Sequence, residues 1–190
     1  LDFAGTKKLD PRITFTRSTT ASYYDGVTTA KAEENLLTYS QDFSNSAWVK
    51  TNITVTGNTG DTTAPDGTST ASKTIATAGA SQHYHQRTGS VFIPVTIGQV
   101  YSLSAFVKAG TETVVQLTAS NLSAFGPDAY ANFNLSAGTI GTVGSAVSNQ
   151  SIVSVGNGWY RISFTCSAVA NDSSGSFIIS FTDNNSSGSR

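Results

Sequence analysis

The feature that most constrains the fold of this chain is its content of short polar side chains. Together 27 serines, 27 threonines and 12 asparagines occupy about a third of the 190 residues. Serine and asparagine side chains compete for the hydrogen bonds of a helical backbone, and threonine is branched at Cβ, which favours strands. The chain has no methionine, and its apolar residues fall in short runs rich in Val, Ile, Tyr and Phe. This composition predicts an all-β protein.

Short strand patterns separated by turn residues follow one another from residue 35 onward. In 101–108 and 159–166 alternate residues share a character, so one face of each strand is expected in a core and the other outside. Only 41–49 suggests a helical turn. We therefore predict a β-sandwich of two antiparallel sheets. The expected strands are 36–39, 53–56, 72–76, 82–87, 90–95, 101–108, 113–120, 129–135, 151–155, 159–167 and 176–182.

The turn signals also suggest how the chain is organised. Residues 1–34 hold short strand-like pieces between Asp10-Pro11 and Asp25-Gly26, and are expected to form an irregular lead-in arm. Residues 35–183 are expected to form the β domain. Residues 184–190 are expected to be a polar tail or linker.

The charge balance argues against two classes of partner. Eleven Lys and Arg stand against twelve Asp and Glu, whereas nucleic-acid affinity needs a concentration of basic residues. No run of apolar residues is long enough to span a bilayer. We therefore expect neither a nucleic-acid nor a membrane partner.

The lone Cys166 shares strand parity with Ile162 and Phe164, which predicts a buried thiol.

The outward faces of four expected strands carry rings, amides and a few charges. Sugar recognition uses an aromatic plate for the C–H face of a pyranose, and hydrogen-bonding groups for its hydroxyls. Phe106 or Trp159 is the expected plate. The alternative is that Trp159 plugs the sandwich edge while Phe106 packs beneath a loop. The candidate ligand surface comprises Phe106, Lys108, Gln116, Asn132, Asn134, Trp159 and Arg161.

The two histidines, His83 and His85, lie two residues apart in a strand, on one face. They could contribute to a zinc site, although no third Cys or His ligand is evident. A sugar-contacting role for Tyr84, His85 or Gln86 is a second interpretation. A solvated strand face is the third.

Four strings in the β domain carry a family resemblance: NLLTYSQDFSNSAW (35–48), APDGTS (64–69), GQVYSLSAFVKAG (98–110) and GNGWYR (156–161). They resemble jelly-roll domains of phage virion proteins, which are similar to xylan- and glucan-binding modules. Residues 9–18 and 21–25 resemble the segment that precedes such domains in phage tail and head-fibre proteins. The resemblance implies a β-jelly roll, glycan recognition on a concave sheet face, and an extracellular or virion-associated location.

The resemblance also points to a structural calcium ion, which many such modules hold between the first and last strands. The candidate ligands are Asp42, Asp66 and Asp183, with carbonyl oxygens of the 65–67 turn as further donors. The acidic residue often found directly after the first-strand Phe is Ser44 here. Asp66 before Gly67 is also explained by turn chemistry alone. No other cofactor is expected.

The function that these observations favour is a non-catalytic carbohydrate-binding module that attaches a larger, phage-type protein to a polysaccharide or cell-surface glycan. We expect no enzymatic activity, because the carboxylates show no pairing typical of glycosidases and no Gly-x-Ser-x-Gly elbow occurs. The first alternative is a structural virion or fibre domain that makes protein–protein contacts, in which case a homo-oligomer is expected. The second is a small β-sandwich polysaccharide lyase or hydrolase.

Overall fold

The structure is a computed structural model that describes residues 22–24, 29–31, 35–57, 60–79, 82–87, 93–120 and 122–182. The chain divides into two compact units, residues 1–38 and 39–190. In the first unit, β1 (Ser22–Tyr24) pairs antiparallel with β2 (Thr29–Lys31). The remainder of the predicted arm 1–34 and the predicted tail 184–190 lie outside the described residues.

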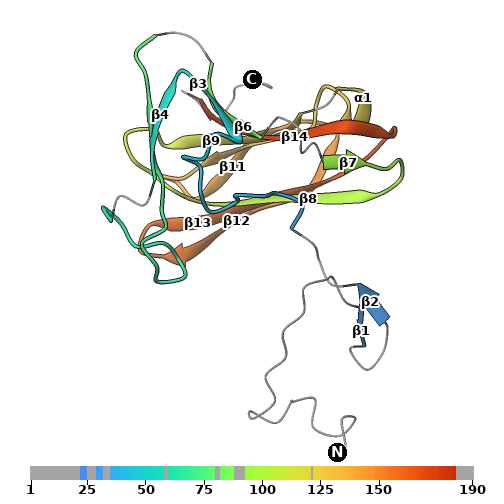
Figure 1. Cartoon of the computed structure of the whole chain (residues 1–190), viewed down its shortest axis with the longest axis horizontal. Helices are drawn as coiled ribbons and strands as arrows, with labels where there is room; N and C mark the ends of the chain where they lie inside the picture. The colour runs from blue at the N-terminus through green and yellow to red at the C-terminus, as the bar shows by residue number, and fades with distance from the viewer. Residues whose placement is uncertain are drawn as a thin grey trace, which may run out of the picture. The chain divides into compact units, whose positions relative to one another are not determined.

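The second unit is built on a seven-stranded antiparallel sheet (Figure 1). One of its two middle strands buries the consecutive residues Phe177, Ile178 and Ile179, so both faces of that strand are covered in this stretch. The strands in spatial order are β11 (Thr139–Val143), β10 (Tyr130–Asn134), β9 (Val114–Ser120), β14 (Asp172–Thr182), β6 (His83–Arg87) and β3 (Trp48–Thr51), with β7 (Ile93–Val95) also paired to β14.

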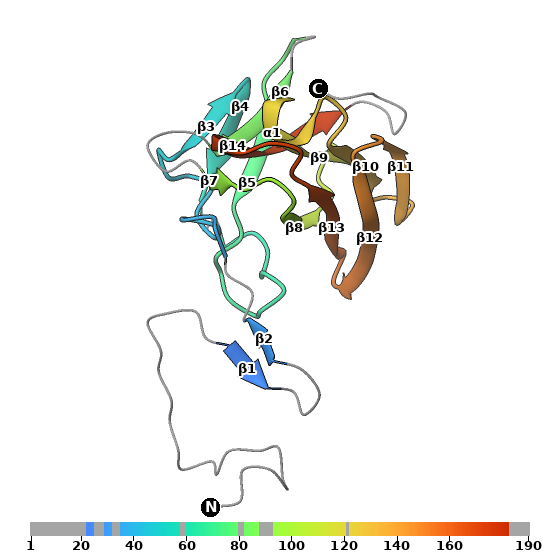
Figure 2. The ribbon, with the colours of Figure 1, turned by 90° about the vertical axis from the view of Figure 1, so that its right-hand side faces the viewer.

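A three-stranded antiparallel sheet forms the other layer. β13 (Trp159–Ser167) lies between β8 (Val100–Lys108) and β12 (Val147–Gly156), and the three strands follow one another across this layer in Figure 2. β4 (Ile53–Thr56) and β5 (Lys73–Ala76) form a separate two-stranded pair. The helix α1 (Leu122–Phe125) has four residues. No helix in the described part of the chain has the length and apolar character needed to cross a membrane.

The core lies between the two layers. Leu117 and Phe133 of the larger sheet and Ile162, Phe164 and Cys166 of the smaller one are almost completely buried. Burial of each large apolar side chain contributes about 1.5–3 kcal/mol. The prediction of an all-β fold of antiparallel sheets is confirmed, and so is the prediction that Cys166 is buried. Desolvation raises the pKa of its thiol to about 12.

Two predicted local structures between residues 36 and 49 differ from those observed. Residues 36–39 were predicted as a strand but form irregular structure and a turn. The side chain of Asn35 accepts a bond from the backbone nitrogen of Leu37 at 3.0 Å, a local bond that competes with sheet pairing. The predicted helical turn 41–49 is a series of turns that ends at Trp48, where β3 begins. The sequence interpretation also omitted β3 and β11.

Candidate functional site

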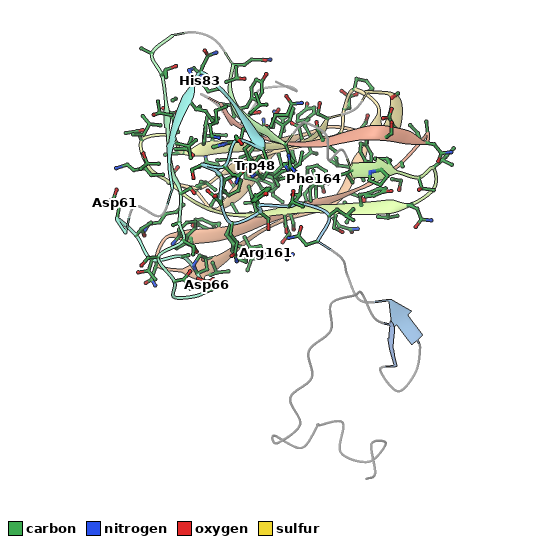
Figure 3. All side chains as sticks on the ribbon, in the orientation of Figure 1. Trp48, Asp61, Asp66, His83, Arg161 and Phe164 are labelled. Atoms are coloured by element: carbon green, nitrogen blue, oxygen red, sulfur yellow. The ribbon has the colours of Figure 1, made fainter. Side chains whose placement is uncertain are left out.

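Three residues form a row across the outer face of the smaller sheet. Arg161 of β13 lies directly opposite Phe106 of β8 on one side and Val153 of β12 on the other. The side chains of Phe106 and Val153 are 52% and 53% exposed, and Arg161 is exposed. Figure 3 shows that Arg161 points away from the sandwich while Phe164, on the same strand, points between the layers. The row is therefore open to solvent.

The alternating sequence of β8 places this row on the outside. Its residues alternate between exposed and half-buried along the whole strand, with Ala105 and Val107 turned inward on either side of Phe106. The neighbouring outward positions of β8 and β13 carry hydroxyl groups, because the strands pair Ser104 with Ser163 and Ser102 with Thr165. The outer face consequently offers one aromatic ring, one guanidinium and a band of hydroxyls.

Trp159 lies at the end of this face but is covered. Its side chain is 8% exposed, and its indole Nε1 donates a 2.9 Å hydrogen bond to the carbonyl oxygen of Thr63 in the β4–β5 connection. Its cross-strand neighbour Lys108 donates to the hydroxyl of Thr62 at 3.1 Å. Thus Phe106 presents its ring to solvent, whereas Trp159 holds the connection against the sheet. Sequence reasoning missed Val153, Thr62 and Thr63, because only strand register and tertiary contact bring them here.

The covering connection is ordered by an aspartate turn. The Asp66 carboxylate accepts hydrogen bonds from the backbone nitrogen and the hydroxyl of Thr68, at 3.0 and 2.6 Å. The bond from the Thr68 hydroxyl is the largest cause of the lowered pKa of Asp66, and the bond from the Thr68 backbone nitrogen lowers it further. Gly67 occupies the turn with a φ of 85°, which favours glycine. The role of Asp66 in this structure is that of a turn residue.

Asp42 plays a similar part in a different turn. Its carboxylate accepts from the hydroxyl and the backbone nitrogen of Ser44, and the hydroxyl bond is the main cause of the lowered pKa of Asp42. The carbonyl oxygens of this turn already accept hydrogen bonds from a positively charged side chain. The ammonium of Lys50 donates to the carbonyls of Ser44, Asn45 and Trp48, at 3.0, 2.7 and 2.9 Å.

Two of the three predicted calcium ligands, Asp42 and Asp66, are therefore hydrogen-bonded within their own turns. The third, Asp183, lies outside the described residues. Within the described ranges, no three His, Cys, Asp or Glu side chains gather closely enough to hold a metal ion. The structural calcium stays a prediction.

The predicted amides lie on the other sheet. Gln116 of β9 and Asn132 of β10 are cross-strand neighbours, and the Gln116 Nε2 donates to the Asn132 Oδ1 at 2.7 Å. Both side chains are fully buried. Asn134 accepts bonds from the backbone nitrogens of Ser136 and Ala137 and so orders the turn after β10. The structure does not bring these three amides to the face that carries Phe106 and Arg161.

The candidates from β6 also belong to the larger sheet. Gln86 donates to the hydroxyl of Ser176 at 3.2 Å, and Tyr84 is half-buried opposite Ser180 of β14. His85 is turned into the core and is only 3% exposed. Its position gives it no surface with which to contact a polysaccharide.

The surroundings of His85 are aromatic. Its ring lies 5.4 Å from that of Phe43, 6.5 Å from that of Trp48 and 6.2 Å from that of Phe181. The ring Nε2 is 2.9 Å from the hydroxyl of Thr74, whereas Nδ1 is buried and has no hydrogen-bond partner among the described residues. Desolvation, with a smaller repulsion from Lys50, lowers the pKa of His85 to about 4. His85 is therefore neutral near pH 7.

The fold and these positions define the chain as an all-β domain of antiparallel sheets with one open, ring-bearing sheet face. Comparison with protein-family models and with curated protein sequences gives no match. Any further assignment rests on the residues themselves.

Proposed function

We propose that this chain is a non-catalytic carbohydrate-binding module of jelly-roll type, which attaches a larger, phage-type protein to a polysaccharide. The observation that carries the proposal is the cross-strand pair of Phe106 and Arg161, an exposed ring beside an exposed guanidinium on the outer face of the smaller sheet. The ligand surface proposed here is smaller than the predicted one: it comprises Phe106, Arg161, Val153 and the adjoining hydroxyls.

The chemistry of this face suits a sugar chain. The Phe106 ring offers an apolar plate to the C–H groups of a pyranose, and the five N–H donors of Arg161 match its oxygen acceptors. The serine hydroxyls alongside can both donate and accept, whereas the hydroxyl of Thr165 already bonds to Ser148 and Asn149. A polysaccharide of neutral sugars needs no concentration of charge, in keeping with the formal net charge of -1.

The expected affinity is weak because only one ring is exposed in the row. Each net hydrogen bond contributes about 1 kcal/mol after the loss of its water contacts. A dissociation constant between about 1 mM and about 1 μM is expected, equivalent to roughly -4 to -8 kcal/mol. Such binding is reversible, as suits an attachment module.

The test is affinity electrophoresis of the whole chain in gels containing a panel of neutral and acidic polysaccharides. Phe106→Ala and Arg161→Ala should each abolish the retardation seen with the native chain. Ile75→Ala is the matched control, because Ile75 is a similarly exposed apolar residue on β5 and should leave retardation unchanged. Native chain that migrates freely in every gel would refute the proposal, as would equal retardation of all four proteins.

A second candidate function is a structural fibre domain, and an exposed apolar cluster favours it. Ile97, Val100 and Val169 are all exposed. Their segments are joined by two backbone bonds, from the Gly98 nitrogen to the Ala168 carbonyl and from the Ala168 nitrogen to the Gln99 carbonyl. Such a cluster is typical of a surface that contacts protein. Light scattering separates the two functions: a stable oligomer that shows no glycan response would favour the fibre domain. A reducing-sugar assay on the same panel tests for hydrolysis.

A further inference from the structure

A cavity of about 460 Å³ opens where β5, β6 and β14 meet the connection between β8 and β9. His83, labelled in Figure 3, lies on the opposite side of the two layers from Arg161, so this cavity is separate from the Phe106 face. The lining combines a ring, an imidazole, a carboxylate and small residues, namely Phe181, His83, Glu112, Thr77, Ala76, Ala78 and Gly79.

The wall formed by the β5–β6 connection is held in place by a hydrogen-bond network. The backbone nitrogen and the hydroxyl of Thr77 both donate to the carbonyl of Asn52, each at 2.9 Å. The side-chain nitrogen of Asn52 in turn donates to the carbonyl of Gln82 at 2.9 Å. These bonds fix both ends of the connection to the segment between β3 and β4. A ligand that enters the cavity therefore meets Thr77 in a position that these bonds already hold.

The same network orients the imidazole of His83. Its Nε2 lies 2.8 Å from the carbonyl oxygen of Thr77. Because a carbonyl can only accept, Nε2 must carry the hydrogen of this bond, and neutral His83 then has an acceptor lone pair on Nδ1. Phe181 is the direct cross-strand neighbour of His83 and is half-buried. The cavity lining thus places an aromatic ring beside an imidazole whose Nδ1 can accept a hydrogen bond.

Glu112 supplies the second acceptor. It stands in the β8–β9 connection and is exposed, so its carboxylate can accept hydrogen bonds from a ligand without first losing a partner in the protein core. Two acceptors and a ring match a compact ligand that has several hydroxyl donors and an apolar C–H face. His83 and Glu112 are only two metal-binding groups, fewer than the four ligands of a typical zinc site.

We infer that this cavity is a second saccharide site, which takes a single sugar ring such as the terminal residue of a glycan. In the bound state, sugar hydroxyls donate to the Glu112 carboxylate and to His83 Nδ1, while the C–H face of the ring packs on Phe181. The site differs from the Phe106 face in kind: a hollow bounded by three strands and a connection has room for one sugar ring, whereas a flat sheet face can contact residues along a chain. Neither site needs the other in order to bind.

The test is titration of the ¹⁵N-labelled chain with glucose, galactose, mannose, xylose and N-acetylglucosamine, followed by NMR. At least one sugar should shift the amide signals of residues 76–79, 83 and 112. Glu112→Gln keeps the shape of the side chain but removes its charge, and should weaken that sugar at least about tenfold, because bonds to a charged acceptor are the stronger ones. Asp61→Asn, which removes a carboxylate from a different connection, should leave the affinity unchanged.

Three outcomes would overturn the inference. The first is that no sugar in the panel shifts the cavity signals. The second is that Glu112→Gln binds the sugar as tightly as the native chain does. The third is that methylammonium shifts these signals and the sugars do not, which would make the cavity an amine site. Phe106→Ala separates the two proposals, because it should abolish retardation by polysaccharide while leaving the cavity shifts intact.

Discussion

The indole nitrogen of Trp159 donates to the carbonyl oxygen of Thr63 at 2.9 Å, and this bond joins residues that are 96 positions apart. It ties the start of β13 to the connection between β4 and β5. Trp159→Phe keeps most of the ring but removes the donor, so the free energy of unfolding should fall by about 1 kcal/mol. Chemical denaturation measures this loss.

The same variant should loosen the connection locally. Amide hydrogen exchange in 62–72 should be faster in Trp159→Phe than in the native chain, while exchange in β9 and β14 should change only as far as global stability does. Unchanged exchange in 62–72 would show that the indole bond does not hold the connection.

Burial of His85 makes stability depend on pH. Above the ordinary pKa of 6.5 this residue is neutral in both the folded and the unfolded chain. As the pH falls below that value, the unfolded chain binds a proton at His85, whereas the folded chain does so only near its pKa of about 4. The free energy of unfolding should therefore decrease on acidification, by about 2 kcal/mol between about pH 7.5 and about pH 5.

Denaturation curves recorded across this range measure the effect. His85→Leu removes the titrating group and should flatten the pH dependence, although the variant will also lose its contact with Thr74. His83→Gln is the control and should keep the native slope. Parallel pH profiles for His85→Leu and the native chain would contradict the prediction.

Lys50 acts as an internal cation for the turn that precedes β3. Lys50→Met leaves the carbonyls of Ser44, Asn45 and Trp48 without this donor and should lower stability by about 1–3 kcal/mol. It also removes a charge that disfavours protonation of His85, so the pKa of His85 should rise from about 4. An NMR titration of the His85 ring detects the rise; an unaltered titration would show that the two groups are not coupled.

Gly144 allows a close approach between the β11–β12 turn and the segment before β10. A Cβ built on Gly144 would lie 1.9 Å from the carbonyl oxygen of Asp128, a backbone atom that cannot move away alone. Gly144→Ala should therefore lower the free energy of unfolding by about 3 kcal/mol. Gly110→Ala is the matched control, since a Cβ there meets nothing within 4 Å. Thermal unfolding of the two variants should differ clearly; similar melting temperatures would refute this reading of the turn.

Local pattern was sufficient to predict the strands that alternate most regularly. β13 was predicted with its observed bounds, and β8 begins only one residue before its prediction. The outward position of Phe106 and the burial of Cys166 also followed from the period of two, because neighbouring side chains in a strand must point to opposite faces. Strands such as β11, with little alternation, gave no comparable signal.

Period alone could not show which outward residues share a surface. Gln116 and Arg161 both point away from an apolar strand face, yet they belong to different sheets. Trp159 has the parity of an outward residue but is buried beneath Thr63. The alternation of residues along a strand predicts the face to which each side chain points. The residues that it contacts on that face come from chain segments far away in the sequence.

The sequence by itself therefore determined the all-β class, the short strands and the alternation that turns Phe106 and Arg161 outward, since these depend on the conformations that neighbouring residues prefer. Only the tertiary structure decided which sheet each strand joins, that a connection covers Trp159, and that His83, Glu112 and Phe181 line one cavity. Those outcomes depend on contacts between residues tens of positions apart, and composition and local periodicity carry no information about such contacts.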